Sequence, residues 1–185
     1  MRHRGIEIDQ SKILAIRDMP SPRNLHELQS LQGRLAYIRR FISNLAGRCQ
    51  PFNRLMRKDE PFIWDDSCQK AFDCIKAYLQ NPPVFGALKP GRPPLLYIAA
   101  QERSVGALLA QTNDEGKEAA LYYIGRSLIE IELRYPSIEK TCLALIFAIK
   151  KLKHYMKAYT VHLIARIDPV KYVMSKPVLT GRLAR

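Results

Sequence analysis

The sequence has 185 residues, and its 30 Lys and Arg against 17 Asp and Glu give a formal net charge of +13. Its 47% hydrophobic residues are enough to bury a core, and no apolar run approaches the roughly 20 residues that cross a bilayer. The basic first residues lack the apolar stretch of a signal peptide, so we expect an intracellular protein without a membrane span or targeting signal.

The first part of the chain is predicted to begin with a short strand and to continue as helices. Residues 5–9 alternate between apolar and polar, which favours a strand, and a helix is expected over residues 11–18. Residues 24–27 form a variant of the capping box. The apolar residues that follow recur every three or four positions over residues 25–45, which predicts an amphipathic helix.

The middle of the chain is predicted to hold further helices and then a linker. A helical stretch over residues 43–58 contains Pro51, so we expect a kink or a junction between helices there. Asp65 or Asp66 caps the next helix. Its predicted apolar face consists of Cys68, Phe72, Ile75 and Leu79. Residues 81–94 contain five prolines and two glycines, and this composition predicts a domain boundary.

The last part of the chain is predicted to alternate strands and helices. The first three expected strands are residues 95–100, 105–111 and 119–126. Ser137 is expected to cap a long helix. Its predicted apolar face is Cys142, Leu145, Ile146, Ile149, Leu152 and Met156. A fourth strand over residues 160–165 and a short helix after Asp168 complete an α+β or α/β order, not a helical bundle.

The positive charge is concentrated in two blocks. Residues 1–60 carry 12 basic and 6 acidic side chains, residues 61–94 carry 4 and 3, and residues 95–185 carry 14 and 8. Lys and Arg contacts with phosphates dominate nucleic-acid affinity. The distribution therefore favours two folded surfaces that face one polyanion, and the alternative is a basic surface that only solvates the protein.

Four runs of residues are recognisable together. They are residues 31–43 (LQGRLAYIRRFIS), residues 62–72 (FIWDDSCQKAF), residues 135–140 (YPSIEK) leading into His154 and Tyr155, and residues 168–185, which begin DPVKY and end LTGRLAR. In this order, and over nearly the whole chain, they resemble the polymerase polyprotein of gypsy-type LTR retrotransposons, particularly plant copies.

The resemblance implies a division of the chain. Residues 1–82 resemble the end of a reverse-transcriptase palm followed by thumb and connection helices, and residues 83–94 form a Pro-rich linker. Residues 95–185 resemble an RNase H-like mixed-sheet domain that we expect to be truncated at its C-terminal end. The polymerase motif of the family, Tyr-x-Asp-Asp, does not occur in the sequence. Since polymerisation needs paired carboxylates that hold two metal ions, we expect no polymerisation by this chain alone.

The resemblance also implies a two-metal nuclease site and a defect in it. RNase H activity hydrolyses the RNA of an RNA–DNA hybrid with two Mg²⁺ ions held by several carboxylates. The first-strand carboxylate of the family falls on Ala99, whereas Glu139 and Asp168 match the helix and strand-end carboxylates. The fourth would lie beyond Arg185. We therefore expect a degenerate site in which Glu139 and Asp168 are the remaining catalytic and metal-binding candidates, and Mg²⁺ binding is impaired.

Each of these two acids also has a structural alternative. Glu139 in the first turn of a helix stabilises the helix dipole. Asp168, which precedes Pro169, is suited to a turn or to an N-cap.

The nucleic-acid surface is expected on two helices. Gln29, Gly33 and Tyr37 share one helix face, and in the thumb helix that this region resembles such a face follows the minor groove of the template–primer. Candidates for phosphate contacts are Arg34, Arg39 and Arg40, with Lys150, Lys151, Lys153 and Lys157 on the long helix. The alternatives are a core position for Tyr37, a helix–helix contact at Gly33 and a merely solvated lysine face.

Three functions remain open from the sequence. The first is a module that holds template–primer duplex or RNA–DNA hybrid and cuts nothing. The second is a residually active, Mg²⁺-dependent ribonuclease H. The third is a genomic relic whose protein is barely made, and the sequence assigns no oligomeric state.

Overall fold

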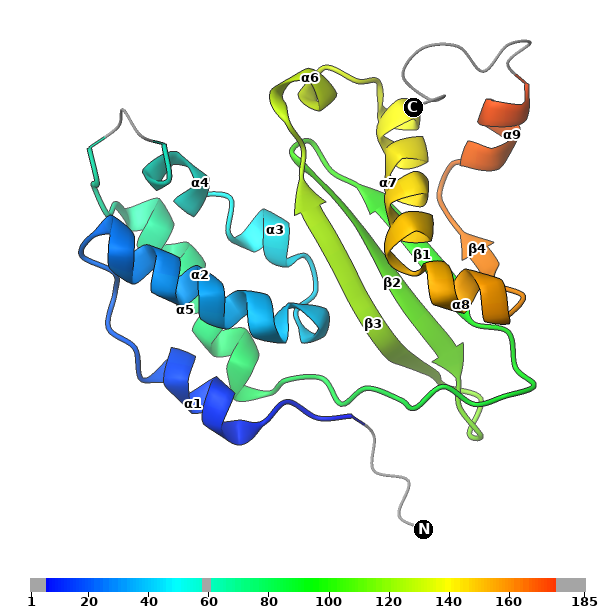
Figure 1. Ribbon diagram of the computed structural model, residues 1–185, viewed down its shortest axis with the longest axis horizontal. Coiled ribbons are helices and arrows are strands. Elements are labelled where there is room, and N and C mark those ends of the chain that lie inside the picture. The colour runs from blue at the N-terminus through cyan, green and yellow to red at the C-terminus, as the bar shows by residue number, and fades with distance from the viewer. Residues whose placement is uncertain (1–5, 58–60, 176–185) are drawn as a thin grey trace. The chain divides into compact units, whose positions relative to one another are not determined.

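The computed structural model describes residues 6–57 and 61–175 (Figure 1). The chain separates into a helical unit, Met1–Ala87, and a sheet unit, Leu88–Arg185. The expected order of helices followed by a mixed sheet is confirmed. Within the described ranges, no helix is both long enough and apolar enough to cross a membrane.

The three longest helices of the helical unit begin where side chains cap them. Asn24 Oδ1 accepts a hydrogen bond from the Glu27 N–H at 2.9 Å, and Asp65 Oδ1 accepts one from the Cys68 N–H at 2.9 Å. These bonds satisfy first-turn N–H groups that have no partner inside the helix. The elements are α1 (Gln10–Arg17), α2 (Leu25–Ile38), the 3-10 helix η1 (Arg39–Phe41), α3 (Leu45–Arg48), α4 (Phe52–Leu55) and α5 (Asp66–Gln80).

The predicted apolar stripes of α2 and α5 supply the core of the helical unit. The buried residues of the two helices are Leu28, Leu31, Leu35 and Ile38 in α2, and Cys68, Phe72, Ile75 and Leu79 in α5. Helix α1 packs on both and buries Ile13 and Ile16. Burying one such large apolar side chain contributes about 1.5–3 kcal/mol, so the stripes fix the helix orientations and leave the opposite face of α2 exposed.

In the helical unit, one prediction of local structure is confirmed and another is wrong, and the backbone explains both outcomes. The stretch around Pro51 is divided into α3 and α4 as expected, because proline lacks the N–H that would continue a helix. The strand predicted over residues 5–9 is wrong. Ile6 forms only a single bridge with Phe85, and α1 already begins at Gln10 behind the capping carboxylate of Asp9. Gly5 lies outside the described residues.

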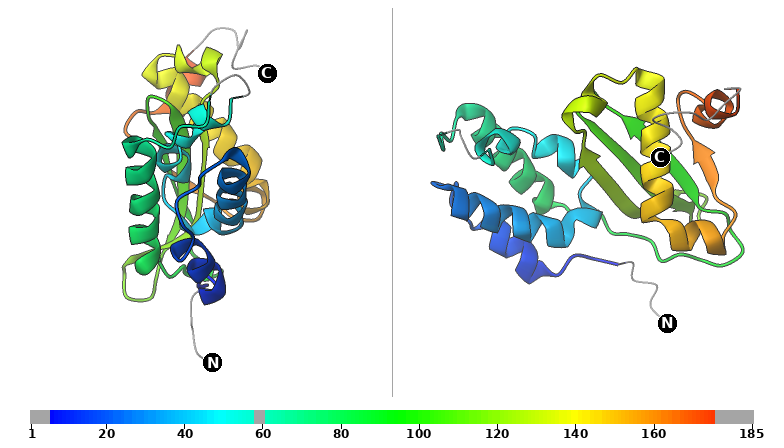
Figure 2. Two further views of the ribbon diagram at one scale, coloured as in Figure 1. Left: turned by 90° about the vertical axis from the view of Figure 1, so that its left-hand side faces the viewer. Right: turned by 45° about the horizontal axis from the view of Figure 1, so that its top comes forward.

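The sheet unit is a mixed sheet covered by a helix. Its strands are β1 (Leu95–Ala100), β2 (Ser104–Thr112), β3 (Glu118–Ser127) and β4 (His162–Ile164), in the order β3-β2-β1-β4. The first three are antiparallel neighbours, and β4 runs parallel to β1. Helix α7 (Ser137–Lys151) lies along one face of the sheet, as Figure 2 shows. The shorter helices are α6 (Glu130–Leu133), α8 (Lys153–Ala158) and α9 (Pro169–Met174).

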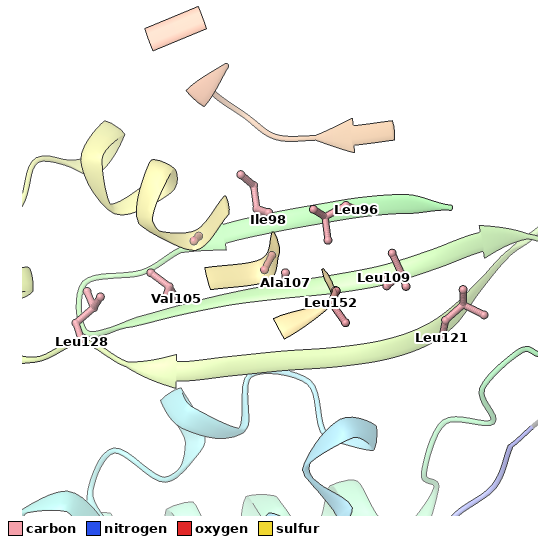
Figure 3. Packing of buried hydrophobic residues seen from close by; sticks show 10 residues of the cluster. Leu96, Ile98, Val105, Ala107, Leu109, Leu121, Leu128 and Leu152 are labelled. Carbon is pink, nitrogen blue, oxygen red and sulfur yellow. The ribbon is translucent and has the colours of Figure 1, made fainter. Parts of the chain in front are cut away.

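The core of the sheet unit lies between the sheet and α7. It consists of Leu96, Ile98, Val105, Ala107, Leu109, Leu121, Leu128, Ala144, Ala148 and Leu152 (Figure 3). Successive side chains of a strand point to opposite faces, so Leu96 and Ile98 reach this core and Ala99 between Ile98 and Ala100 does not.

The long helix predicted to extend to Met156 is divided at Leu152, where a φ of −104° and a ψ of 24° end α7. Its predicted apolar face is partly wrong as well, since Ile149 is 44% exposed while Ala144 and Ala148 are buried. Alanines four residues apart make a flat strip that fits closely against a sheet, and this long-range contact outweighs the larger apolar residues.

One buried polar side chain ties the start of the sheet unit to β2. Gln111 is 3% exposed, and its Oε1 accepts a hydrogen bond from the Lys89 N–H at 2.8 Å. Its Nε2 donates to the carbonyl oxygens of Lys89 and Arg92 at 2.9 and 2.8 Å. The amide is thereby satisfied, as a buried polar group must be.

Candidate nucleic-acid interface and RNase H-like site

One face of α2 carries the pattern predicted for nucleic-acid contact. Gln29, Gly33 and Tyr37 are four residues apart and therefore line up along the helix. All three are exposed, and Tyr37 keeps 71% of its surface accessible. The alternative that Tyr37 belongs to the core is wrong, because the opposite face of the helix supplies the core.

Gly33 has no packing role among the described residues. A methyl group at this position would meet no atom within 4 Å, so no other helix packs there and the helix-contact alternative is also wrong. Its backbone is helical and does not need the left-handed conformation that favours glycine. Glycine inside a helix costs about 1 kcal/mol relative to alanine, and the described fold does not offset that cost.

A depression of about 330 Å³ lies between α1 and α2 beside this face. It is lined by Lys12, Ala15, Ser30, Gly33, Arg34 and Tyr37. Lys12 Nζ lies 5.6 Å from the centre of the Tyr37 ring, within the range of a cation–π contact. Arg34 Nη1 donates a hydrogen bond to the Ala15 carbonyl oxygen and so joins α2 to α1.

Lys12 lies on a different helix from Tyr37 and was not among the residues predicted from the sequence to contact nucleic acid. Only the packing of α1 on α2 brings the two side chains together, and no local pattern marks this contact.

The two other arginines predicted to contact phosphates follow α2 in η1. Arg39 is exposed, and its guanidinium forms no hydrogen bond or ion pair with the part of the chain that the structure describes. Arg40 is half-buried, and its guanidinium carbon lies 5.4 Å from the centre of the Phe41 ring. Among the three arginines, Arg39 therefore has its guanidinium most available to an external anion.

The predicted lysine face is distributed over two helices. Lys150 and Lys151 end α7, whereas Lys153 and Lys157 lie on α8. All four are exposed, and none forms an ion pair within residues 6–57 and 61–175. The break at Leu152 therefore makes this a basic surface at a helix junction, not the single helix face expected from the sequence.

Ala99, the residue of β1 that was predicted at the first-strand carboxylate position, has no side-chain ligand for a cation. Ala99 is exposed, pairs with Gly106 of β2 and carries only a methyl group. Glu139 lies in the first turn of α7 and is half-buried. Burial, and secondarily the negative charge of Glu139, raises the pKa of the Cys142 thiol. That thiol lies 3.7 Å from the Pro169 carbonyl oxygen, so Glu139 is on the side of α7 that packs near α9.

Asp168 is the N-cap of α9. Its Oδ1 accepts hydrogen bonds from the Val170 and Lys171 N–H groups, both at 3.0 Å. Among the described residues, no three His, Cys, Asp or Glu side chains are arranged so that they could hold a metal ion. Of the residues predicted at the metal site, Ala99 has no oxygen ligand in its side chain, and Oδ1 of Asp168 is engaged in the N-cap of α9.

The comparison with protein families agrees with this fold. The sequence profile of the RNase H-like domain found in reverse transcriptase matches residues 64–163, more than half of the chain. The chain therefore belongs to this family of RNase H-like reverse-transcriptase domains.

Curated relatives place the family in retrotransposon polyproteins. The Tf2-3 and Tf2-4 transposon polyproteins of Schizosaccharomyces pombe are each 28% identical to this chain over 180 residues. The match covers 97% of this chain and 13% of each relative, so the chain spans a small part of the length of these polyproteins.

Solved reverse transcriptases share the fold. A foamy viral protease-reverse transcriptase in complex with dsDNA matches 93% of this chain and 36% of its own, with a TM-score of 0.77 and 18% identity. The same viral protein in complex with an RNA/DNA hybrid matches 94% of this chain and 24% of its own, with a TM-score of 0.76 and 18% identity.

Proposed function

We propose that this chain is the thumb–connection segment and RNase H-like domain of a gypsy-type, plant-like LTR retrotransposon polyprotein, and that it holds template–primer duplex or RNA–DNA hybrid inside the cell. The helical unit corresponds to the end of the palm with the thumb and connection helices, and the sheet unit to the RNase H-like domain. The net charge of +13 and the nucleic-acid ligands named for the foamy viral structures support this proposal.

The exposed face of α2 carries the proposal. Gln29 offers an amide for base or sugar edges, Gly33 allows close approach of a strand, and Tyr37 offers a ring that packs on a sugar. None of the three fills the core, and Gly33 lowers helix stability. An external partner accounts for all three residues together.

The RNase H-like site is degenerate in this proposal. Two bridged Mg²⁺ ions need several carboxylates, and Ala99 removes the central one. The hydrogen bonds of Asp168 to the first turn of α9 support a structural role for this carboxylate. The sheet unit then contributes binding through Lys150, Lys153 and their neighbours, and it does not cut the strand.

Binding is tested by titrating the whole chain into labelled RNA–DNA hybrid and following anisotropy. We expect affinity to fall steeply between about 50 and 200 mM salt, because phosphate contacts release counterions. Tyr37→Ala should weaken binding about tenfold, comparable with the loss of one aromatic stacking contact. Gln29→Ala should weaken it less.

Gln80→Ala is the matched control for Gln29→Ala, because Gln80 is an exposed glutamine at the end of α5 and does not line the depression beside Tyr37. An affinity for the hybrid that does not change with salt concentration would contradict the binding proposal. So would α2 variants that bind as tightly as the control.

Cleavage is tested with the same hybrid in the presence of Mg²⁺ or Mn²⁺, and we expect none. Cleavage that both EDTA and Glu139→Gln abolish would contradict the degenerate site and establish a residually active ribonuclease H. Cleavage that survives Glu139→Gln would indicate a contaminating nuclease and leave the proposal intact.

A further inference from the structure

The depression beside Tyr37 is one end of a longer groove between α1 and α2. A second depression of about 520 Å³ shares Ala15, Ser30 and Arg34 with the first, so the two are adjacent, and the Arg34–Ala15 hydrogen bond lies at their boundary. The second extends past Ser30 to His26, Glu27 and Asp18. Together the two depressions form a groove along α1 and α2, with one end beside Tyr37 and the other beside Glu27.

The two ends of the groove differ in charge. Lys12 and the Tyr37 ring form one end, and the carboxylates of Asp18 and Glu27 lie at the other. Glu27 Oε2 already accepts a hydrogen bond from the Arg23 N–H at 2.7 Å, so it serves the start of α2. Opposite charges attract and like charges repel, so an anionic group is directed to the Lys12 end.

Lys12 keeps its ammonium group available. The residue is exposed, and its Nζ forms no hydrogen bond or ion pair with the residues that the structure describes. The positive charge of Lys12 acts on the carboxylate of Asp9. The pKa of Asp9 is lowered chiefly by the hydrogen bonds from Ser11 and least by Lys12. Asp9 Oδ1 is committed to the Ser11 N–H at 2.9 Å as the cap of α1. The three donors of the lysine ammonium therefore remain for an external acceptor.

We propose that Lys12 binds a backbone phosphate of a nucleic-acid strand whose sugar lies over Gly33 and against the Tyr37 ring. Helix α1 is then the second wall of the interface, and Arg34, through its bond to the Ala15 carbonyl, is a positioning residue that sets the distance between the walls. This inference rests on the proposed function, because the face of α2 must first meet nucleic acid.

A glycine at position 33 is consistent with a sugar lying over the helix at this point. Gly33 lines the depression together with Lys12 and Tyr37, so a longer side chain would occupy the space that the sugar requires. The ring, the ammonium group and the open backbone thus recognise features common to every nucleotide, namely a sugar face and a phosphate. Binding at this end of the groove is independent of base sequence.

The test compares Lys12→Ala, Lys12→Arg and Lys70→Ala with the unchanged chain over a series of salt concentrations. Lys70 is an exposed lysine on α5 of the same unit and does not line the groove. Lys12→Ala should weaken binding about threefold, the size of an exposed ion pair. It should also reduce the slope of log affinity against log salt by about 0.9, because one phosphate contact is lost.

Lys12→Arg should keep that slope, and Lys70→Ala should match the unchanged chain. Thermal unfolding of each variant controls for structure, since a purely structural lysine would shift the unfolding midpoint and leave the salt slope unchanged. If the unchanged chain binds and Lys12→Ala has the affinity and slope of Lys70→Ala, this inference is overturned while the proposed function stands. If the unchanged chain does not bind, the proposed function fails and the inference with it.

Discussion

The exposed face of α2 and the predicted RNase H-like site of the sheet unit both carry residues that the family resemblance implies for function, yet only those of the sheet unit include a side chain that the fold itself uses. Gln29 and Gly33 contribute nothing to the core, and Gly33 even lowers helix stability. In the sheet unit, Asp168 caps a helix and Ala99 has no reactive group. A residue that the fold does not use is available for contact with a partner, whereas an acid that the fold already uses is weak support for catalysis.

The largest effect expected from this comparison concerns a residue that serves only the fold. Leu109 has no exposed surface and lies in the core between the sheet and α7. Leu109→Ala should lower the free energy of unfolding by about 2–5 kcal/mol, because the cavity adds to the lost apolar transfer. Tyr37→Ala should change it by less than about 0.5 kcal/mol. Urea unfolding followed by circular dichroism measures both changes. If the two variants lost similar free energies of unfolding, Tyr37 would have a structural role and the contrast between the two regions would be wrong.

Asp168 allows its structural role to be separated from a role as metal ligand. Asp168→Ala should destabilise the sheet unit by about 1 kcal/mol through loss of the N-cap, whereas Asp168→Asn should be nearly neutral, because asparagine caps as well as aspartate. Thermal unfolding with and without Mg²⁺ measures this. A Mg²⁺-dependent rise in the unfolding midpoint that Asp168→Asn removes would assign the carboxylate to a metal instead.

Gly33 should show a gain in stability and a loss in binding together. Gly33→Ala should stabilise the helical unit by up to about 1 kcal/mol, since alanine has the higher helix propensity and the methyl group meets no neighbour. The same variant should bind hybrid more weakly than the unchanged chain. Unfolding and anisotropy measured on one preparation test this, and unaltered affinity would remove the best support for a ligand over α2.

The smallest effect concerns an acid used by the fold alone. Glu132 accepts hydrogen bonds from Arg126 at 2.6 and 2.7 Å, and chiefly these lower the pKa of its carboxyl below the ordinary 4.5. Because the pKa of Glu132 is lower in the folded state than in the unfolded state, the ion pair stabilises the fold when the pH is above 4.5. That stabilisation is lost as the pH falls through the lowered pKa of the folded protein. The unfolding midpoints of the unchanged chain and Glu132→Gln should therefore differ at neutral pH and converge well below pH 4.5. A constant difference would contradict this assignment.

Much of the fold could be predicted because it depends on neighbours in the sequence. The capping of α2 by Asn24 and of α5 by Asp65 involves residues three positions apart, and both helix starts are where the sequence places them. The alternation along β1 likewise separates buried Leu96 and Ile98 from exposed Ala99 without knowledge of the partner strand.

The features that escaped prediction depend on contacts between distant residues. The apolar character of Ile149 favours burial, but the sheet accepts the smaller Ala148 and leaves Ile149 exposed. Helix α6 depends on the Arg126–Glu132 pair and on the Ile129 N–H, which donates to Glu132 at 3.0 Å. The candidate site follows the same rule, since the residues of α2 share one helix whereas Lys12 joins them only through packing.

The amide of Gln111 has a consequence for how the protein can be dissected. Three hydrogen bonds join this amide to the backbone of Lys89 and Arg92, so the segment just before β1 is attached to β2 and belongs to the folded sheet unit. A shortened protein that starts at Leu95 would retain all four strands but leave a buried amide without these partners, and each buried polar group left unsatisfied costs about 1–3 kcal/mol. The smallest version of the sheet unit that keeps this amide satisfied begins no later than Leu88, seven residues ahead of its first strand.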